Sequence, residues 1–159
     1  MDLTLEKINK MSVLSSQSIE TLTLLQPLCP RTKHEPTNMT YGLGAASVDI
    51  RLDQDIDLEP GGFCLASAIE KFNIPNFIVA IIHDKSTLAR RGLSVFNTLV
   101  DPGFHGFLTL ELSNRGKEHI FLPRESPIAQ VIFHKLDYPT KMPYDGKYQS
   151  QARGPQVAR

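Results

Sequence analysis

The stretch from His83 to Asn114, HDKSTLARRGLSVFNTLVDPGFHGFLTLELSN, carries the strongest structural and functional signals in the chain. In its last third, apolar residues alternate with other residues, which indicates a β-strand with two distinct faces. We expect the core face to hold Leu108, Leu110 and Leu112, and the opposite face to hold Phe107, Thr109, Glu111 and Ser113. A glutamate between two strand leucines is a candidate general base if its face lines a cleft or a subunit interface. If that face meets solvent, Glu111 is an ordinary surface residue.

The first third of the stretch predicts a single helical turn over Ser86–Arg91, which Gly92 closes in a left-handed conformation. Cations and hydroxyls gather there, namely Lys85, Ser86, Thr87, Arg90 and Arg91. Such a group suits an anionic ligand, although a capped turn with solvated charges fits it as well. The chain has no Walker motif, so a P-loop nucleotide fold is not supported.

The rest of the chain predicts an all-β sandwich or barrel that is preceded by one helix over Ile8–Leu25. Ser12 or Ser15-Ser16 could cap a helix that starts near there. We expect Pro27–Thr40, which holds three prolines, to be an irregular connection. The expected strands cover the alternating pattern of Val48–Leu52, Phe63–Phe72, Phe77–His83, Leu93–Val100, His119–Leu122 and Ile128–Leu136. The apolar run of Phe77–His83 predicts a strand covered on both faces.

Composition restricts the class of protein. A chain of 159 residues with 41% apolar residues fits a single domain, 1–159, with one core. The formal net charge of zero provides no overall field to attract nucleic acid or a membrane, and no apolar run is long enough to span a bilayer. The N-terminus lacks a secretory signal pattern. Reduced thiols at Cys29 and Cys64 and a cytoplasmic location are therefore expected.

Three further features bear on function. The five histidines show no metal-ligand spacing, and the zinc deaminase signature is absent, so we expect neither a protein metal site nor a zinc-hydroxide mechanism. Asp101 precedes Pro102-Gly103, which alone is an ordinary turn. The segment 139–159 is predicted to be a mobile lid, with Tyr144, Lys147 and Gln151 among its candidate ligand residues, or a tail without a ligand.

Five ordered motifs resemble the dCTP deaminases, which are relatives of the trimeric dUTPases. They are YGLGAASVDIRL, HDKSTLARRGL, VDPGFHGFLTLELSN, PIAQVIF and YDGKYQSQARGP, and the resemblance extends over nearly the whole chain from about Met11. The resemblance implies a distorted β-barrel or jelly-roll subunit and a homotrimer with active sites between subunits. Residues 1–10 precede the usual start of the family and are a possible extension.

The resemblance also implies roles for individual residues. Glu111 matches the catalytic glutamate, and Ser86 and Arg90 match its partners, with Lys85 and Thr87 near the phosphates. Asp101 matches the aspartate that contacts the deoxyribose hydroxyl, and the tail residues Tyr144, Lys147 and Gln151 match those that fold over the triphosphate. Gln130 matches a structural element. The implied reaction is the hydrolysis of dCTP to dUTP and ammonia, with Mg²⁺ bound through the substrate triphosphate.

One departure from the family pattern lies between Gly92 and Asp101, where the chain is about two residues shorter than typical deaminases. Leu99 stands near the position of a small residue that lines the base pocket in the family. A dUTP pyrophosphatase, or a bifunctional enzyme that uses both Asp101 and Glu111, therefore remains an alternative. A non-catalytic, nucleotide-binding trimer is a third possibility.

Overall fold

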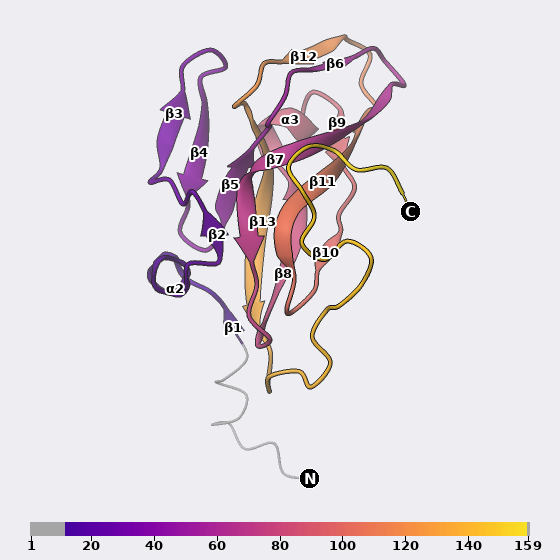
Figure 1. The fold of residues 1–159 in the computed structure, drawn as a ribbon. Coiled ribbons are helices and arrows are strands. Elements are labelled where there is room, and N and C mark those ends of the chain that lie inside the picture. The colour runs from indigo at the N-terminus through magenta and orange to yellow at the C-terminus, as the bar shows by residue number, and fades with distance from the viewer. Residues whose placement is uncertain (1–11, 159) are drawn as a thin grey trace.

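The computed structural model describes residues 12–158. Its largest sheet has seven strands in the order β10-β8-β13-β5-β4-β3, with β1 paired to β13 (Figure 1). These strands are β1 (Ser12–Val13), β3 (Thr32–His34), β4 (Met39–Leu43), β5 (Val48–Arg51), β8 (Ile78–Asp84), β10 (Leu99–Val100) and β13 (Pro127–Lys135). The β3–β4 hairpin extends away from the body of the molecule.

A second sheet has four strands in the order β2-β7-β11-β9, and a third consists of β12 and β6. The strands are β2 (Leu25–Gln26), β6 (Ile56–Leu58), β7 (Phe63–Asn73), β9 (Leu93–Val95), β11 (His105–Asn114) and β12 (Ile120–Leu122). Two short helices, α2 (Ser16–Leu22) and α3 (Ser86–Ala89), complete the described elements. The expected mainly-β architecture with one N-terminal helix is confirmed. No helix within residues 12–158 has the length and apolar character needed to cross a membrane.

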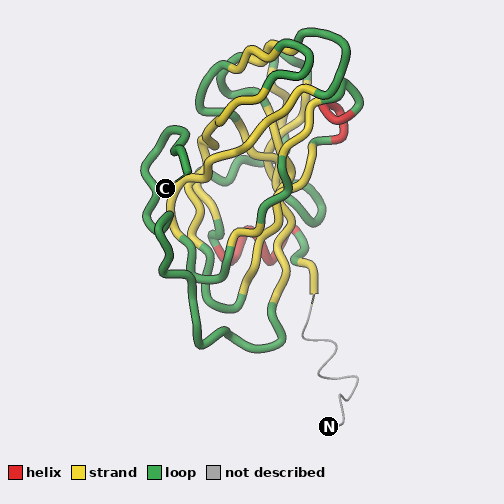
Figure 2. The backbone as a smooth tube through the Cα atoms, turned by 90° about the vertical axis from the view of Figure 1, so that its right-hand side faces the viewer, coloured by secondary structure: helices red, strands yellow, loops and turns green. Residues whose placement is uncertain are grey.

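The core lies between the two larger sheets. Ile50 and Phe133 from the seven-stranded sheet and Phe72 and Leu110 from the four-stranded sheet are all at most 1% exposed. A buried ion pair also joins the sheets, because Arg51 Nε on β5 lies 2.9 Å from Glu70 Oε1 on β7. The tail after β13 does not enter this core, and Figure 2 shows it as a long loop along one side of the strands.

Several predicted boundaries were wrong. The predicted helix over Ile8–Leu25 is much shorter: Ser12–Val13 is a strand, and Thr23 leaves the helix with a left-handed φ of 51°. The helix begins at Ser16 with Ser15 as its N-cap residue, which agrees with the start expected at Ser15-Ser16. The first residues of the predicted helix, 8–11, lie outside the described part of the chain. Pairing with β13 determines the extended conformation at Ser12. This is a tertiary effect, which the helical periodicity of the sequence does not reveal. The supposed irregular connection Pro27–Thr40 contains β3 and the start of β4.

The predicted strand Leu93–Val100 is two strands in different sheets. β9 pairs with β11, whereas β10 pairs with β8, so the chain changes sheets around Asn97. The predicted strand Phe77–His83 is present as β8, but only alternate residues are fully buried, so one of its faces is only partly covered. The left-handed conformation expected at Gly92 is confirmed by its φ of 88°. A Cβ atom there would lie 2.4 Å from Gly116 N, which excludes any larger residue.

Candidate active site

A pocket of about 600 Å³ opens beside the outer face of β11. Its wall combines residues of β7, β10 and β11 with the turn after β10 and the C-terminal tail. The lining residues are Phe63, Leu65, Thr98, Leu99, Val100, Asp101, Phe104, Leu108, Thr109, Glu111, Tyr144, Tyr148, Gln151, Gln156 and Ala158. Four residues that the sequence singled out, Asp101, Glu111, Tyr144 and Gln151, therefore meet at one cavity.

Glu111 lies on the face of β11 that turns away from the core. Leu110 and Leu112 on either side are at most 1% exposed, so the alternation anchors the strand and directs Glu111 to the pocket. Its Oε2 atom is buried and has no hydrogen-bond partner among the described residues. Leu108, expected on the core face, packs against the core but is only partly buried and also lines the pocket. It lies at the register shift between Phe107 and Thr109.

Asp101 comes from the turn that joins β10 to β11. The Asp101 carbonyl accepts a hydrogen bond from Phe104 N at 3.1 Å, and Gly103 N donates to Ile74 O at 2.9 Å. Gly103 has a φ of 92°, and a Cβ atom there would lie 2.6 Å from Pro143 Cβ in the tail. The turn therefore places Asp101 at the pocket and also gives the tail a surface on which to pack.

The C-terminal tail is docked on its own chain. Tyr144 N donates to Pro102 O at 2.7 Å, and the ring of Tyr144 packs edge-on against Phe104 with centroids 6.0 Å apart. Further along, Gln151 forms a parallel bridge with Gly106, while its side chain donates to Thr109 Oγ1 at 2.7 Å. Tail residues therefore form one wall of the pocket.

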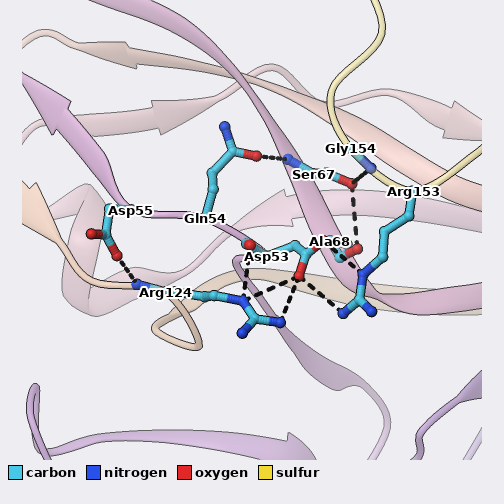
Figure 3. A network of polar contacts seen from close by, with 8 residues as sticks. All are labelled: Asp53, Gln54, Asp55, Ser67, Ala68, Arg124, Arg153 and Gly154. Carbon is cyan, nitrogen blue, oxygen red and sulfur yellow. Dashed lines mark hydrogen bonds and ion pairs between the residues drawn. The ribbon is translucent and has the colours of Figure 1, made fainter.

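Beyond Gln151, Asp53 anchors the tail through Arg153 and also binds Arg124, which precedes β13 (Figure 3). Asp53 Oδ2 accepts from Arg153 Nε at 2.7 Å, and Asp53 Oδ1 accepts from Arg124 Nη2 at 3.0 Å. Next to this cluster, Gly154 N donates to Ser67 Oγ at 3.2 Å. These contacts fix the tail between Gln151 and Gln156, which both line the pocket. Lys147, which the sequence placed near the phosphates, is exposed with its Nζ 5.1 Å from the centre of the Tyr148 ring.

The cation-and-hydroxyl group around α3 lies elsewhere in the chain. Ser86, Thr87 and Arg90 are exposed and do not belong to the lining of the pocket. Arg90 N donates to Ser86 O at 3.1 Å, so these two residues lie one turn apart. Lys85 is buried, and its Nζ lies 2.8 Å from Asp49 Oδ2. A single chain therefore does not bring Ser86 or Arg90 to Glu111.

The segment between Gly92 and Asp101, which the sequence predicts to be shortened, forms another part of the wall. Leu99 lines the pocket and is 58% exposed, and Phe63, which also lines it, is 57% exposed. The turn before Leu99 is held at both ends, since Phe96 N donates to Glu111 O and Ile82 N donates to Thr98 O. The pocket is thus bordered by apolar side chains that one chain leaves uncovered.

Sequence reasoning missed residues whose role depends on the docked tail. Thr109 receives hydrogen bonds from Gln151 Nε2 and from Gln156 N, at 2.7 and 2.9 Å. Tyr148 lines the pocket, and its backbone N–H donates to the Tyr144 hydroxyl at 3.1 Å. The only available signal for Thr109 was its position on the same face as Glu111. Gln130, predicted to be structural, donates from Nε2 to Ser47 Oγ at 3.0 Å and does not line the pocket.

Solved structures share this fold. A dCTP deaminase from Agrobacterium tumefaciens superposes with a TM-score of 0.66 at 18% identity, covering 79% of this chain and 49% of the other. A dUTPase of EIAV superposes with a TM-score of 0.55 at 19% identity, covering 86% and 98%. The expected dUTPase-like β fold is therefore confirmed.

The amino-acid sequence also matches a known protein family. A family model described as dCTP deaminase-like matches residues 44–136, which is more than half of the chain. A relative from Methanosphaera stadtmanae, named "dCTP deaminase, dUMP-forming", is 35% identical over 121 residues, covering 72% of this chain and 61% of the relative. The chain thus spans about three fifths of the length of that curated relative. It belongs to the dCTP deaminase-like family.

Proposed function

We propose that this protein catalyses the hydrolytic deamination of dCTP, with Glu111 as the general base. The observation that carries the proposal is the buried, unpartnered Oε2 atom of Glu111 at a pocket that also holds Asp101. An unsatisfied carboxylate oxygen costs stability, so a position that retains one is a candidate for chemistry. Membership of the dCTP deaminase-like family supports the same reaction.

In the proposed mechanism, Glu111 removes a proton from a water molecule while the water oxygen attacks C4 of cytosine. Glu111 then passes protons toward N3 and the departing amino group. The C4–N4 bond breaks, ammonia leaves, and C4 keeps the new oxygen as a carbonyl. Ser86 and Arg90 would orient the water and stabilise the charge that develops in the transition state. This chemistry uses a carboxylate base in place of a zinc-bound hydroxide.

The proposal requires a second copy of the chain. Ser86 and Arg90 are exposed and lie outside the pocket of their own chain. In a closed cyclic homotrimer, the α3 segment of one subunit would meet the Glu111 pocket of its neighbour. The exposed apolar residues Phe63 and Leu99 at the pocket favour this arrangement, because a neighbouring subunit would cover them.

The remaining residues fit the recognition of a deoxynucleoside triphosphate. Asp101 lines the pocket and would accept a hydrogen bond from the deoxyribose hydroxyl, while Tyr144 and Gln151 form the tail side of the pocket. Thr87 and Lys147 are exposed and would approach the phosphates from α3 and from the tail. Closure of the tail over bound substrate would exclude bulk water from the reacting base.

Magnesium would be carried by the substrate. The described residues contain no cluster of three His, Cys, Asp or Glu side chains that could hold a metal ion. In the proposed function, Mg²⁺ is bound mainly by the substrate phosphates, which is the usual arrangement at nucleotide sites. When bound, the ion would neutralise phosphate charge, while Glu111 performs the proton transfers.

A second candidate function is the combined conversion of dCTP to dUMP. It is favoured by the dUMP-forming name of the M. stadtmanae relative and by the presence of both Asp101 and Glu111 at one pocket. In that case Asp101 would also position a water molecule for attack on the triphosphate, and pyrophosphate would be released. A plain dUTP pyrophosphatase would use the same aspartate and release no ammonia.

Chromatographic product analysis with Mg²⁺ and dCTP, dUTP or dTTP distinguishes these functions. Ammonia with dUTP as the final product supports simple deamination, whereas ammonia, pyrophosphate and dUMP together support the combined reaction. The absence of ammonia from dCTP would refute the deaminase proposal. For the combined reaction, Asp101→Asn is expected to suppress pyrophosphate release most strongly.

A further inference from the structure

A buried ion pair lies between the central strands and helix α3. Asp49 on β5 has a side chain 6% exposed, and Lys85, which directly follows β8, has one 9% exposed. Their charged atoms lie 2.8 Å apart. Strand β13 separates β5 from β8 in the sheet, because Gln130 is paired with Asp49 on one side and with His83 on the other. The Lys85 side chain therefore spans β13 to reach Asp49.

Stability alone is a poor explanation for this pair. Removing two charges from water costs free energy that their mutual attraction repays only when the remaining polar atoms are also satisfied. Here Asp49 Oδ1 is buried without a hydrogen-bond partner in the described part of the chain. Apolar residues of similar size would often be as stable or more stable at such a site. The ion pair does, however, fix the position of Lys85, at the start of α3, relative to Asp49 on β5.

The point that it fixes is the start of α3. Lys85 is the N-cap residue of this helix, and its carbonyl accepts hydrogen bonds from Leu88 N and Ala89 N, both at 2.9 Å. The helix is only four residues long, and Leu88 is its one buried residue. So short a helix is not stable alone, and its direction depends on the few side chains that attach it to the sheet. Lys85 and Leu88 are those attachments.

We propose that Asp49 is a positioning residue for the reaction, which acts through Lys85 to set the direction of α3. This inference rests on the proposed function, because α3 carries Ser86 and its C-terminal neighbour Arg90. Asp49 holds the Lys85 amine in a buried ion pair. The amine therefore orients the helix and does not contact phosphate. The phosphate contact that family resemblance implies for Lys85 is replaced by this indirect role.

The test compares two variants with the wild-type protein. The double variant Asp49→Leu/Lys85→Met replaces both charges with apolar groups, so no lone charge is left buried. We expect its melting temperature to remain close to that of the wild type, while kcat for dCTP falls by about 10- to 100-fold because the catalytic groups are misplaced. KM is expected to change little. Asp49→Asn, which keeps an acceptor for Lys85, should show the same pattern with a smaller loss.

Two controls separate this role from others. Asp57→Asn removes a charge at the β6–β12 sheet and should leave kcat unchanged. Amide exchange of Leu88, Ala89 and Arg90 reports the order of α3 without any reference to activity, and we expect it to be faster in the double variant and in Asp49→Asn.

Wild-type kcat in a folded double variant, or in Asp49→Asn if the double variant does not fold, would overturn the proposal. A rise in KM with kcat unchanged would also overturn it, because Lys85 would then contact substrate directly. If the wild-type protein itself does not deaminate dCTP, the proposed function fails, and unchanged amide exchange in the variants would separately refute the positioning of α3.

Discussion

Thr109→Val tests how the C-terminal tail is held at the pocket. Thr109 Oγ1 accepts hydrogen bonds from Gln151 Nε2 at 2.7 Å and from Gln156 N at 2.9 Å. Valine keeps the shape of threonine and its preference for β-strands, but it has no acceptor oxygen. The substitution therefore removes two tail contacts while leaving β11 intact.

The expected magnitude follows from these two bonds. Each contributes about 1 kcal/mol net, so the docked tail should lose about 2 kcal/mol relative to the undocked tail. Since 1.4 kcal/mol is a factor of ten, the undocked population should rise by about 30-fold. The bridge between Gly106 and Gln151 and the ion pair of Arg153 with Asp53 remain, so the tail should loosen without being released completely.

Amide hydrogen exchange of residues 149–157 measures this population directly. Exchange at Gln156, whose N–H is one of the lost donors, should be about 30-fold faster in Thr109→Val. Thr109→Ser keeps the hydroxyl and is the matched control, so its exchange should stay close to that of the wild type. Wild-type exchange in Thr109→Val, or equally fast exchange in Thr109→Ser, would refute the reasoning.

Three further predictions follow from single side chains. Glu111→Gln should lower the rate of dCTP deamination by about 10²- to 10⁴-fold without lowering the melting temperature; rapid ammonia release would contradict its role as the base. Arg51→Met should destabilise the fold by about 3 to 5 kcal/mol in denaturant titration, because it leaves the buried Glu70 carboxylate without a cationic partner, with only the backbone N–H of residue 51 still donating to Oε2; an unchanged midpoint would refute this. Hydrogen bonding to Asp57 raises the pKa of His119 above 6.5, so the stabilisation is fully present below pH 6.5 and is lost as pH rises through the folded-state pKa; an NMR titration should show this pKa falling in Asp57→Asn.

The alternation in β11 was sufficient to predict both the strand and the direction of Glu111. In residues 108–113 a leucine is followed three times by a polar residue. A shift of the strand pairing by one residue would turn these leucines to the outer face, so the register is strongly determined. The same reasoning was incomplete at Leu108, which packs against the core but also lines the pocket, at a register shift that depends on the partner strand β7. It failed at Ser12, where pairing with β13 determines the conformation.

Several residues of the site could be predicted from the sequence, but which of them lie close together in the fold could not. Asp101, Glu111 and Tyr144 share a pocket because the turn after β10 and the returning tail both reach the face of β11. Neither the docking of the tail on Thr109 nor the burial of Lys85 against Asp49 leaves a local signal, since each joins segments far apart in the chain. Resemblance to the family named Ser86 and Arg90, while the structure shows that they lie away from Glu111 within one chain.

Subunit complementation is the most direct test of a catalytic site shared between copies. Glu111→Gln and Ser86→Ala should each be nearly inactive alone, because every site then lacks one group. Refolding the two variants together in equal amounts should form trimers that contain both variants. About a quarter of the sites should then combine an intact Glu111 with an intact Ser86 from the neighbour, because each of the two subunits at a site is the required variant in about half of the cases. We therefore expect ammonia release from dCTP to recover to about a quarter of the wild-type rate. No recovery in mixed oligomers whose formation has been verified would contradict the shared site.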